Sequence, residues 1–257
     1  MFFLLEQEKK LLHSAIIKDI AVTEENKLCS PLRIGAIFTI GPYLFPDFVS
    51  PLQKNAPDMP LIIEEGCTST LRERLRKGEL DVAILCLPFE EPDVVVQPLF
   101  DEPLMIVLPP NHSLATRTSI KPEELEKEHI LLLGEEHCFR GTVKDAVPNI
   151  NKHHYATNPT DKDSQANSLD TLCTMVASGF GITILPETAV KGSSFCSTCS
   201  TNLVAIPFEE NSPKRTTAIA WRAGFPRHRT IEAVRNAIYT SYNVKSDNKF
   251  SPTLVHD

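Results

Sequence analysis

The stretch LRIGAIFTIGP, residues 32–42, decides the fold of this 257-residue chain. Its first six residues include apolar Leu32, Ile34, Ala36 and Ile37 and a single charged residue, Arg33, which is typical of a buried strand. Ser30-Pro31 before it favours extended backbone, and Pro42 opens a helical pattern that continues to Asn55. The same order of strand and helix recurs along the chain, and such alternation predicts a parallel sheet covered by helices.

Outside this stretch, strands and helices continue to alternate, and the pattern restarts after residue 103. We therefore predict two α/β units in one chain. Apolar residues on one face also predict an amphipathic helix over residues 1–22. Further strands are predicted at 60–65, 80–87, 94–99, 104–108, 129–133, 181–185, 203–207 and 216–221, further helices at 70–77, 121–128, 138–147, 168–178 and 227–242, and surface loops at 148–165 and 191–202.

Composition excludes several classes of protein. The chain has 26 Lys and Arg against 33 Asp and Glu, a net charge of −7, which disfavours direct binding to duplex DNA. No apolar run approaches the roughly 20 residues of a membrane-spanning helix, and the N-terminus lacks a secretion signal. Seven cysteines are too few for a disulfide scaffold. We therefore expect a cytoplasmic protein without a membrane partner.

Cys138 is the sharpest candidate for chemistry. It follows the predicted strand 129–133 and opens a predicted helix, where the helix dipole favours a thiolate. His137 and Arg140 add hydrogen-bond donors and positive charge beside it. Peroxide oxidises such a thiolate to a sulfenic acid. The alternative is a small buried hydrophobic residue, which is the common fate of a reduced cysteine.

Thr39 and Thr68 each stand between a predicted strand and a predicted helix. Either threonine suits a helix cap, and either also suits a ligand site, because ligands of open α/β sheets bind at this edge. Arg222 follows the predicted strand 216–221. It is placed to reach a cleft or to form a structural salt bridge.

Five segments together resemble the effector-binding domain of LysR-type transcription regulators. Within that family, TIGPYL and LLLGEEHCFR (residues 131–140) are most similar to the OxyR group of peroxide sensors. The five segments are PLRIG at 31–35, TIGPYL at 39–44, LRKGELD at 75–81, PLFDEP at 98–103 and ASGFGITILP at 177–186.

The resemblance implies two Rossmann-like subdomains joined by two crossover strands, as in type 2 periplasmic binding proteins. It implies one regulatory subdomain at residues 31–102 plus 223–245 and another at 103–222, followed by a flexible tail at 246–257. Residues 1–22 would be the linker helix that pairs subunits in a homodimer or homotetramer. Promoter DNA would be bound only through a winged helix-turn-helix that we expect to be absent from this sequence.

The resemblance also implies that Thr39, Thr68, His137 and Arg140 surround Cys138 and bind peroxide, without metal, cofactor or enzymatic turnover. One position departs from the OxyR pattern. The second cysteine of that group, nine residues after the first, is replaced by Val147. The usual disulfide therefore cannot form. Oxidation would stop at a sulfenic acid or glutathione adduct, or use another thiol, the nearest candidates in sequence being Cys173, Cys196 and Cys199.

Three other functions stay open. A regulatory domain of the same fold could bind a small organic anion in its cleft without redox switching. An enzyme with Cys138 as nucleophile and His137 as base is disfavoured, because adjacent side chains at a helix start diverge. A transport binding protein would need an export signal. The spacing of Cys196 and Cys199 suits zinc, but no second ligand pair accompanies it.

Overall fold

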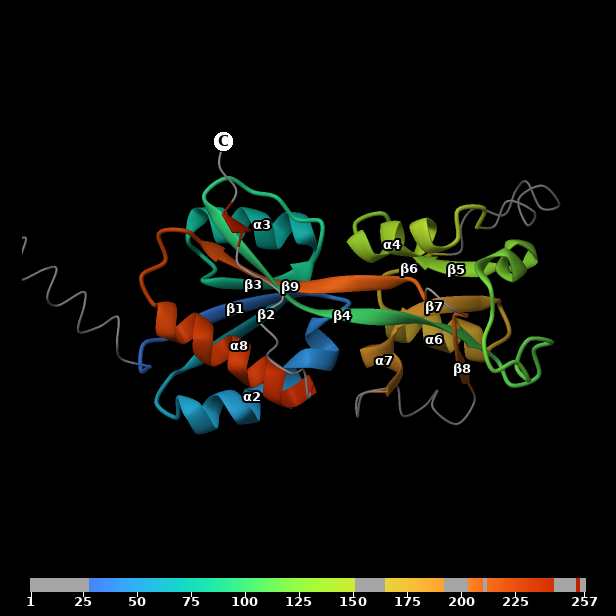
Figure 1. Ribbon diagram of the computed structural model, residues 1–257, viewed down its shortest axis with the longest axis horizontal. Coiled ribbons are helices and arrows are strands. Elements are labelled where there is room, and N and C mark those ends of the chain that lie inside the picture. The colour runs from blue at the N-terminus through green and yellow to red at the C-terminus, as the bar shows by residue number, and fades with distance from the viewer. Residues whose placement is uncertain (1–27, 151–164, 192–202, 210–211, 243–252, 255–257) are drawn as a thin grey trace, which may run out of the picture.

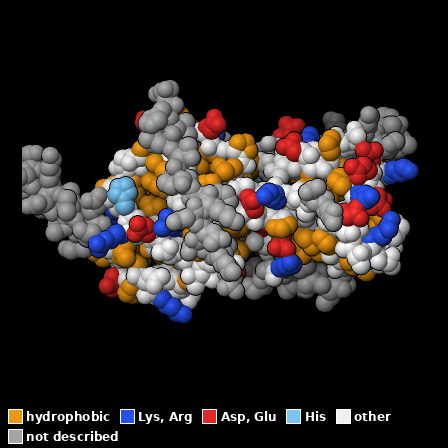
Figure 2. All heavy atoms as spheres, viewed as in Figure 1, with side chains coloured by type: hydrophobic (Ala, Val, Ile, Leu, Met, Phe, Trp, Pro, Cys, Tyr) orange, Lys and Arg blue, Asp and Glu red, His pale blue; other side chains and the backbone are white. Residues whose placement is uncertain are grey.

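The computed structural model describes residues 28–150, 165–191, 203–209, 212–242 and 253–254. The described chain forms two α/β lobes, with two long strands running from one lobe into the other (Figure 1). Among these residues, no helix has the length and apolar character needed to cross a membrane. Acidic and basic side chains are interspersed over the described part of the face shown in Figure 2.

The first lobe is built on three parallel strands with β1 in the middle. Helices α2 and α8 cover one face of this sheet and α3 covers the other (Figure 1). Helix α3 ends at Gly78, which has the left-handed φ of +76° that favours glycine there. The elements are β1 (Leu32–Ile37), α2 (Gly41–Asn55), β2 (Leu61–Gly66), α3 (Thr68–Lys77), β3 (Val82–Cys86) and α8 (His228–Tyr242).

The second lobe repeats this arrangement around β5, which pairs in parallel with β6 on one side and β7 on the other. Its core is apolar and separate from that of the first lobe. The elements are the 3₁₀ helix Pro122–Lys127, β5 (Ile130–Leu133), α4 (Cys138–Ala146), β6 (Gln165–Ala166), α6 (Leu169–Ala177), β7 (Ile182–Pro186), α7 (Glu187–Lys191) and β8 (Val204–Pro207).

Two antiparallel strands, β4 (Val94–Leu108) and β9 (Lys214–Arg222), connect the lobes. The predicted break between strands 94–99 and 104–108 is wrong, because β4 is continuous. The polar residues that suggested the break are paired inside the ladder: Asp101 lies opposite Thr216, and Glu102 lies opposite Arg215. Apart from this break, the predicted fold class of two α/β subdomains joined by crossover strands is confirmed.

The subdomain limits stay a proposal, because β4 and β9 belong to both lobes. Residues 218–221 of β9 pack in the first core, so the second crossing lies within β9. The predicted linker helix at 1–22 lies outside the described residues. Within the predicted tail, only Thr253–Leu254 is described, as the short strand β10 paired with β4.

Candidate functional site

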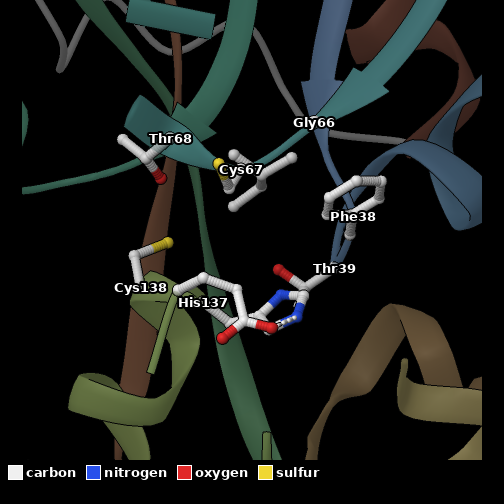
Figure 3. Close-up of a pocket in the computed structure, with 9 residues that line it drawn as sticks. Phe38, Thr39, Gly66, Cys67, Thr68, His137 and Cys138 are labelled. Atoms are coloured by element: carbon white, nitrogen blue, oxygen red, sulfur yellow. Dashed lines mark ion pairs between the residues drawn. The ribbon is translucent and has the colours of Figure 1, made fainter. Parts of the chain in front are cut away.

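A small pocket lies where the two lobes meet (Figure 3). Its walls come from the carboxyl ends of β1 and β2 and from the N-termini of α3 and α4, the edge at which open α/β sheets bind ligands. Its volume of about 10 Å³ accommodates one water-sized molecule. The lining residues are Ile37, Phe38, Thr39, Gly66, Cys67, Thr68, Glu136, His137 and Cys138.

Cys138 enters the pocket as the first residue of α4 and is exposed. The next residue, Phe139, is 1% exposed and anchors the helix in the second core. His137, just before the helix, is buried, with its ring edge-on to Phe38 at 5.8 Å between centroids. Its Nε2 lies 3.5 Å from Oε1 of Glu136. This packing fixes the imidazole near Thr39, while the Cys138 thiol points toward Thr68 (Figure 3).

Thr68 supplies a hydroxyl from the opposite wall, as the first residue of α3. Its Oγ1 is buried, yet no hydrogen-bond partner reaches it from the described residues. In Figure 3 this hydroxyl points toward Cys138. A buried hydroxyl without a protein partner is costly, so Thr68 Oγ1 is suited to bond a small molecule in the pocket.

Thr39 is buried and fixed by Arg215, a residue of β9 that sequence reasoning missed. Arg215 donates from Nη1 to Thr39 Oγ1 and from Nη2 to the Thr39 carbonyl, each at 3.0 Å. Because Thr39 Oγ1 accepts this bond, its own proton can point elsewhere. The predicted cap is not seen, since no side chain caps α2.

Arg215 is held by Glu102, the residue opposite it on β4, with 2.6 Å between Nε and Oε2. Both side chains are almost fully buried. Burial by itself lowers the pKa of Arg215, but the Glu102 carboxylate and nearby thiols outweigh burial, so this pKa is raised. The guanidinium also lies over the Phe139 ring at 5.2 Å. Strand β9 thus contacts Thr39 in the pocket wall and Phe139 directly after Cys138.

Cys67 was also missed, although it lines the pocket directly before Thr68. Its Sγ lies 3.1 Å from Ser69 Oγ and 3.1 Å from Thr70 Oγ1. These hydroxyls, Ser69 first, lower the pKa of the Cys67 thiol to about 7. The sequence could have identified Cys67 as a candidate, because it stands between the same predicted strand and predicted helix as Thr68.

Two predicted site residues do not line the pocket. Arg140 is buried behind it and donates from Nη1 to the Leu133 carbonyl at 2.8 Å. Arg222 donates to the carbonyls of Leu75 and Leu80 at the end of α3 and borders a different depression of about 560 Å³. Arg222 therefore binds two backbone carbonyls. Among the described residues it neither lines the pocket nor forms the salt bridge that was the alternative prediction.

Of the three thiols considered as partners for Cys138, the structure describes one. Cys173 is buried in the second core, and Cys196 and Cys199 lie outside the described residues. Val147 is buried just after the end of α4. Within the described ranges, no group of three His, Cys, Asp or Glu side chains is arranged to hold a metal ion.

Comparisons with known proteins agree with this architecture. The family model for the LysR substrate binding domain matches residues 25–241. The DNA-binding transcriptional dual regulator OxyR of Escherichia coli K12 is 32% identical over 240 residues, which cover 91% of this chain and 74% of that protein.

Solved structures show the same fold. The reduced OxyR regulatory domain of Pseudomonas aeruginosa is 43% identical with a TM-score of 0.74, covering 86% of this chain and 100% of that one. A cysteine-substituted OxyR of Corynebacterium glutamicum with bound hydrogen peroxide is 26% identical with a TM-score of 0.77, covering 91% and 72%. The chain therefore belongs to the LysR family of transcription regulators and has the fold of their OxyR-like regulatory domains.

Proposed function

We propose that this chain is the sensing domain of a peroxide-responsive transcription regulator, and that hydrogen peroxide bound in the pocket oxidises Cys138. The observation that carries the proposal is the pocket itself. It has room for one water-sized molecule and presents the Cys138 thiol together with the unpartnered Thr68 hydroxyl. A pocket of about 10 Å³ suits a ligand of the size of peroxide better than an organic anion, the alternative ligand.

In the proposed reaction, the Cys138 thiolate attacks one peroxide oxygen. The O–O bond breaks, the sulfur becomes a sulfenic acid, and the departing hydroxide takes a proton to leave as water. Thr39 and Thr68 would hold the two peroxide oxygens by hydrogen bonds, and His137 would donate to the departing oxygen. Arg215 would position Thr39 through the two bonds described above.

The remaining roles follow from the family. The E. coli relative is a DNA-binding regulator, so we propose that the chain acts on promoter DNA as part of a homodimer or homotetramer. Its place would then be the bacterial cytoplasm. In this proposal, oxidation changes the relation between the two lobes, and that change alters transcription without turnover of a substrate.

The rate of Cys138 oxidation tests the proposal. We expect Cys138 to react with hydrogen peroxide on the order of 100-fold faster than Cys29, since Cys138, unlike Cys29, lies in a pocket with donors arranged around the bound oxidant. Cys29 is exposed and provides an internal control. Dimedone trapping followed by peptide mass spectrometry measures both rates in one sample. If the two thiols react equally fast, peroxide sensing at Cys138 is wrong.

Thr68→Val is expected to slow Cys138 oxidation about tenfold, the value of one hydrogen bond to the reacting peroxide. The free energy of unfolding should change by less than about 1 kcal/mol, because Thr68 Oγ1 has no hydrogen-bond partner among the described residues. Dimedone trapping and urea unfolding measure the two effects. An unchanged oxidation rate in a normally stable variant would remove Thr68 from the proposed site.

A further inference from the structure

We infer that Cys67 is the resolving thiol of this domain, which attacks oxidised Cys138 to form a disulfide that joins the two lobes. This inference rests on the proposed function, because it needs a sulfenic acid at Cys138. It assigns to Cys67 the role that a valine at position 147 cannot fill.

The two cysteines line the same pocket from opposite lobes (Figure 3). Cys67 directly precedes α3 of the first lobe, and Cys138 begins α4 of the second. The pocket that both residues line has a volume of about 10 Å³. Cys138 is exposed and Cys67 is partly exposed, so each thiol is open to reaction.

Cys67 is also the described thiol best prepared to attack. The hydroxyls of Ser69 and Thr70, each 3.1 Å from its sulfur, favour the thiolate. The resulting pKa of about 7 leaves much of Cys67 deprotonated at neutral pH.

The other described cysteines are poorer candidates. Cys86 is buried on β3, and burial raises the pKa of its thiol to about 12, so it stays protonated. Cys173 is enclosed in the second core. Cys29 precedes β1, at the end of that strand opposite Thr39 and the pocket. Among the described cysteines other than Cys138, only Cys67 lines the pocket, and its pKa is lowered rather than raised.

The reaction balances with hydrogen peroxide as the only oxidant. The Cys138 sulfenic acid carries the oxygen left by the first step. The Cys67 thiolate attacks the Cys138 sulfur, the S–O bond breaks, and the hydroxide leaves as water after taking a proton. Over both steps two thiols lose two electrons and two protons, and one peroxide is reduced to two waters.

A disulfide between Cys67 and Cys138 would affect the structure differently from a disulfide between positions 138 and 147. Positions 138 and 147 mark the two ends of that helix. At about 1.5 Å per residue they are roughly 13 Å apart, beyond the approximately 7 Å limit between Cα atoms for a disulfide. A bond between them would require α4 to unfold. A bond between Cys67 and Cys138 would join the start of α3 to the start of α4 and lock the relative position of the lobes.

The fate of Cys138 under one equivalent of hydrogen peroxide tests the inference. After alkylation of the remaining thiols, peptide mapping without reductant should find a linked Cys67–Cys138 peptide that dithiothreitol releases. In Cys67→Ser this peptide should be absent, and the dimedone adduct of Cys138 should increase about tenfold because nothing consumes the sulfenic acid. Cys29→Ser is the matched control and should behave like the unaltered chain.

Two outcomes separate the inference from the proposed function. If Cys138 sulfenic acid accumulates equally with and without Cys67, and no linked peptide forms, the inference is wrong while peroxide sensing stands. A parallel sample treated with diamide, which joins neighbouring thiols without peroxide, covers the reverse case. A Cys67–Cys138 link with diamide but an inert Cys138 with peroxide supports the pairing and overturns the proposed function; no link with either oxidant overturns the pairing.

The pH dependence of the second step provides another test. A thiol with a pKa of about 7 is about one tenth thiolate at pH 6 and about nine tenths at pH 8. Disulfide formation should therefore accelerate about tenfold between these values. Ser69→Ala with Thr70→Val removes both hydroxyls, raises the pKa of Cys67 and moves the rise to higher pH. A profile that the double variant leaves in place would contradict this role of the hydroxyls.

Discussion

Replacing Arg215 with methionine is expected to lower the free energy of unfolding by about 3–5 kcal/mol, because it leaves the Glu102 carboxylate buried without its counter-charge. The two side chains are 1% and 3% exposed, with 2.6 Å between Nε and Oε2. Thr39 also loses the donors to its hydroxyl and its carbonyl. Urea unfolding of the full chain measures the change.

The same pair of strands offers a matched control. Lys214 and Asp101 form an ion pair one position away, with side chains 60% and 33% exposed. Lys214→Met should cost less than about 1 kcal/mol, because water screens this pair. Adding Glu102→Leu to Arg215→Met should recover part of the loss, since no isolated charge remains buried. Equal losses from Arg215→Met and Lys214→Met would show that burial does not control the energy of the pair.

Phe139→Ala is the second substitution with a large expected effect, a loss of about 3–5 kcal/mol in the free energy of unfolding. Phe139 is 1% exposed and fills the second core directly after Cys138. Its removal leaves a cavity under the start of α4 and takes away the ring that faces Arg215. Thermal and urea unfolding measure the loss.

Phe180→Ala is the control for this substitution, because the Phe180 side chain is 64% exposed. Its expected effect is within about 0.5 kcal/mol. A double-mutant cycle between Arg215→Met and Phe139→Ala should show a coupling of about 0.5–2 kcal/mol from the cation over the ring. If Phe139→Ala is no more harmful than Phe180→Ala, α4 is not anchored through this side chain.

Much of the fold could be predicted because hydrophobic periodicity is a local property. The mostly apolar strand at 32–37 and the helix that follows it depend on neighbouring residues alone, and both appear where expected. The end of α3 at Gly78 was equally readable, since only the local backbone decides it. The break expected within β4 shows the limit of this reasoning, because the partners of Asp101 and Glu102 lie on the distant strand β9.

The sequence by itself determined which residues stand at helix starts, and therefore placed Thr39, Thr68, His137 and Cys138 among the candidates. Only the tertiary structure decided which side chains meet. Arg215 reaches Thr39 across 176 positions of sequence, and Cys67 shares a pocket with Cys138. These contacts arise because β4 and β9 cross between the lobes and bring separate helix starts together, an arrangement that no local pattern records.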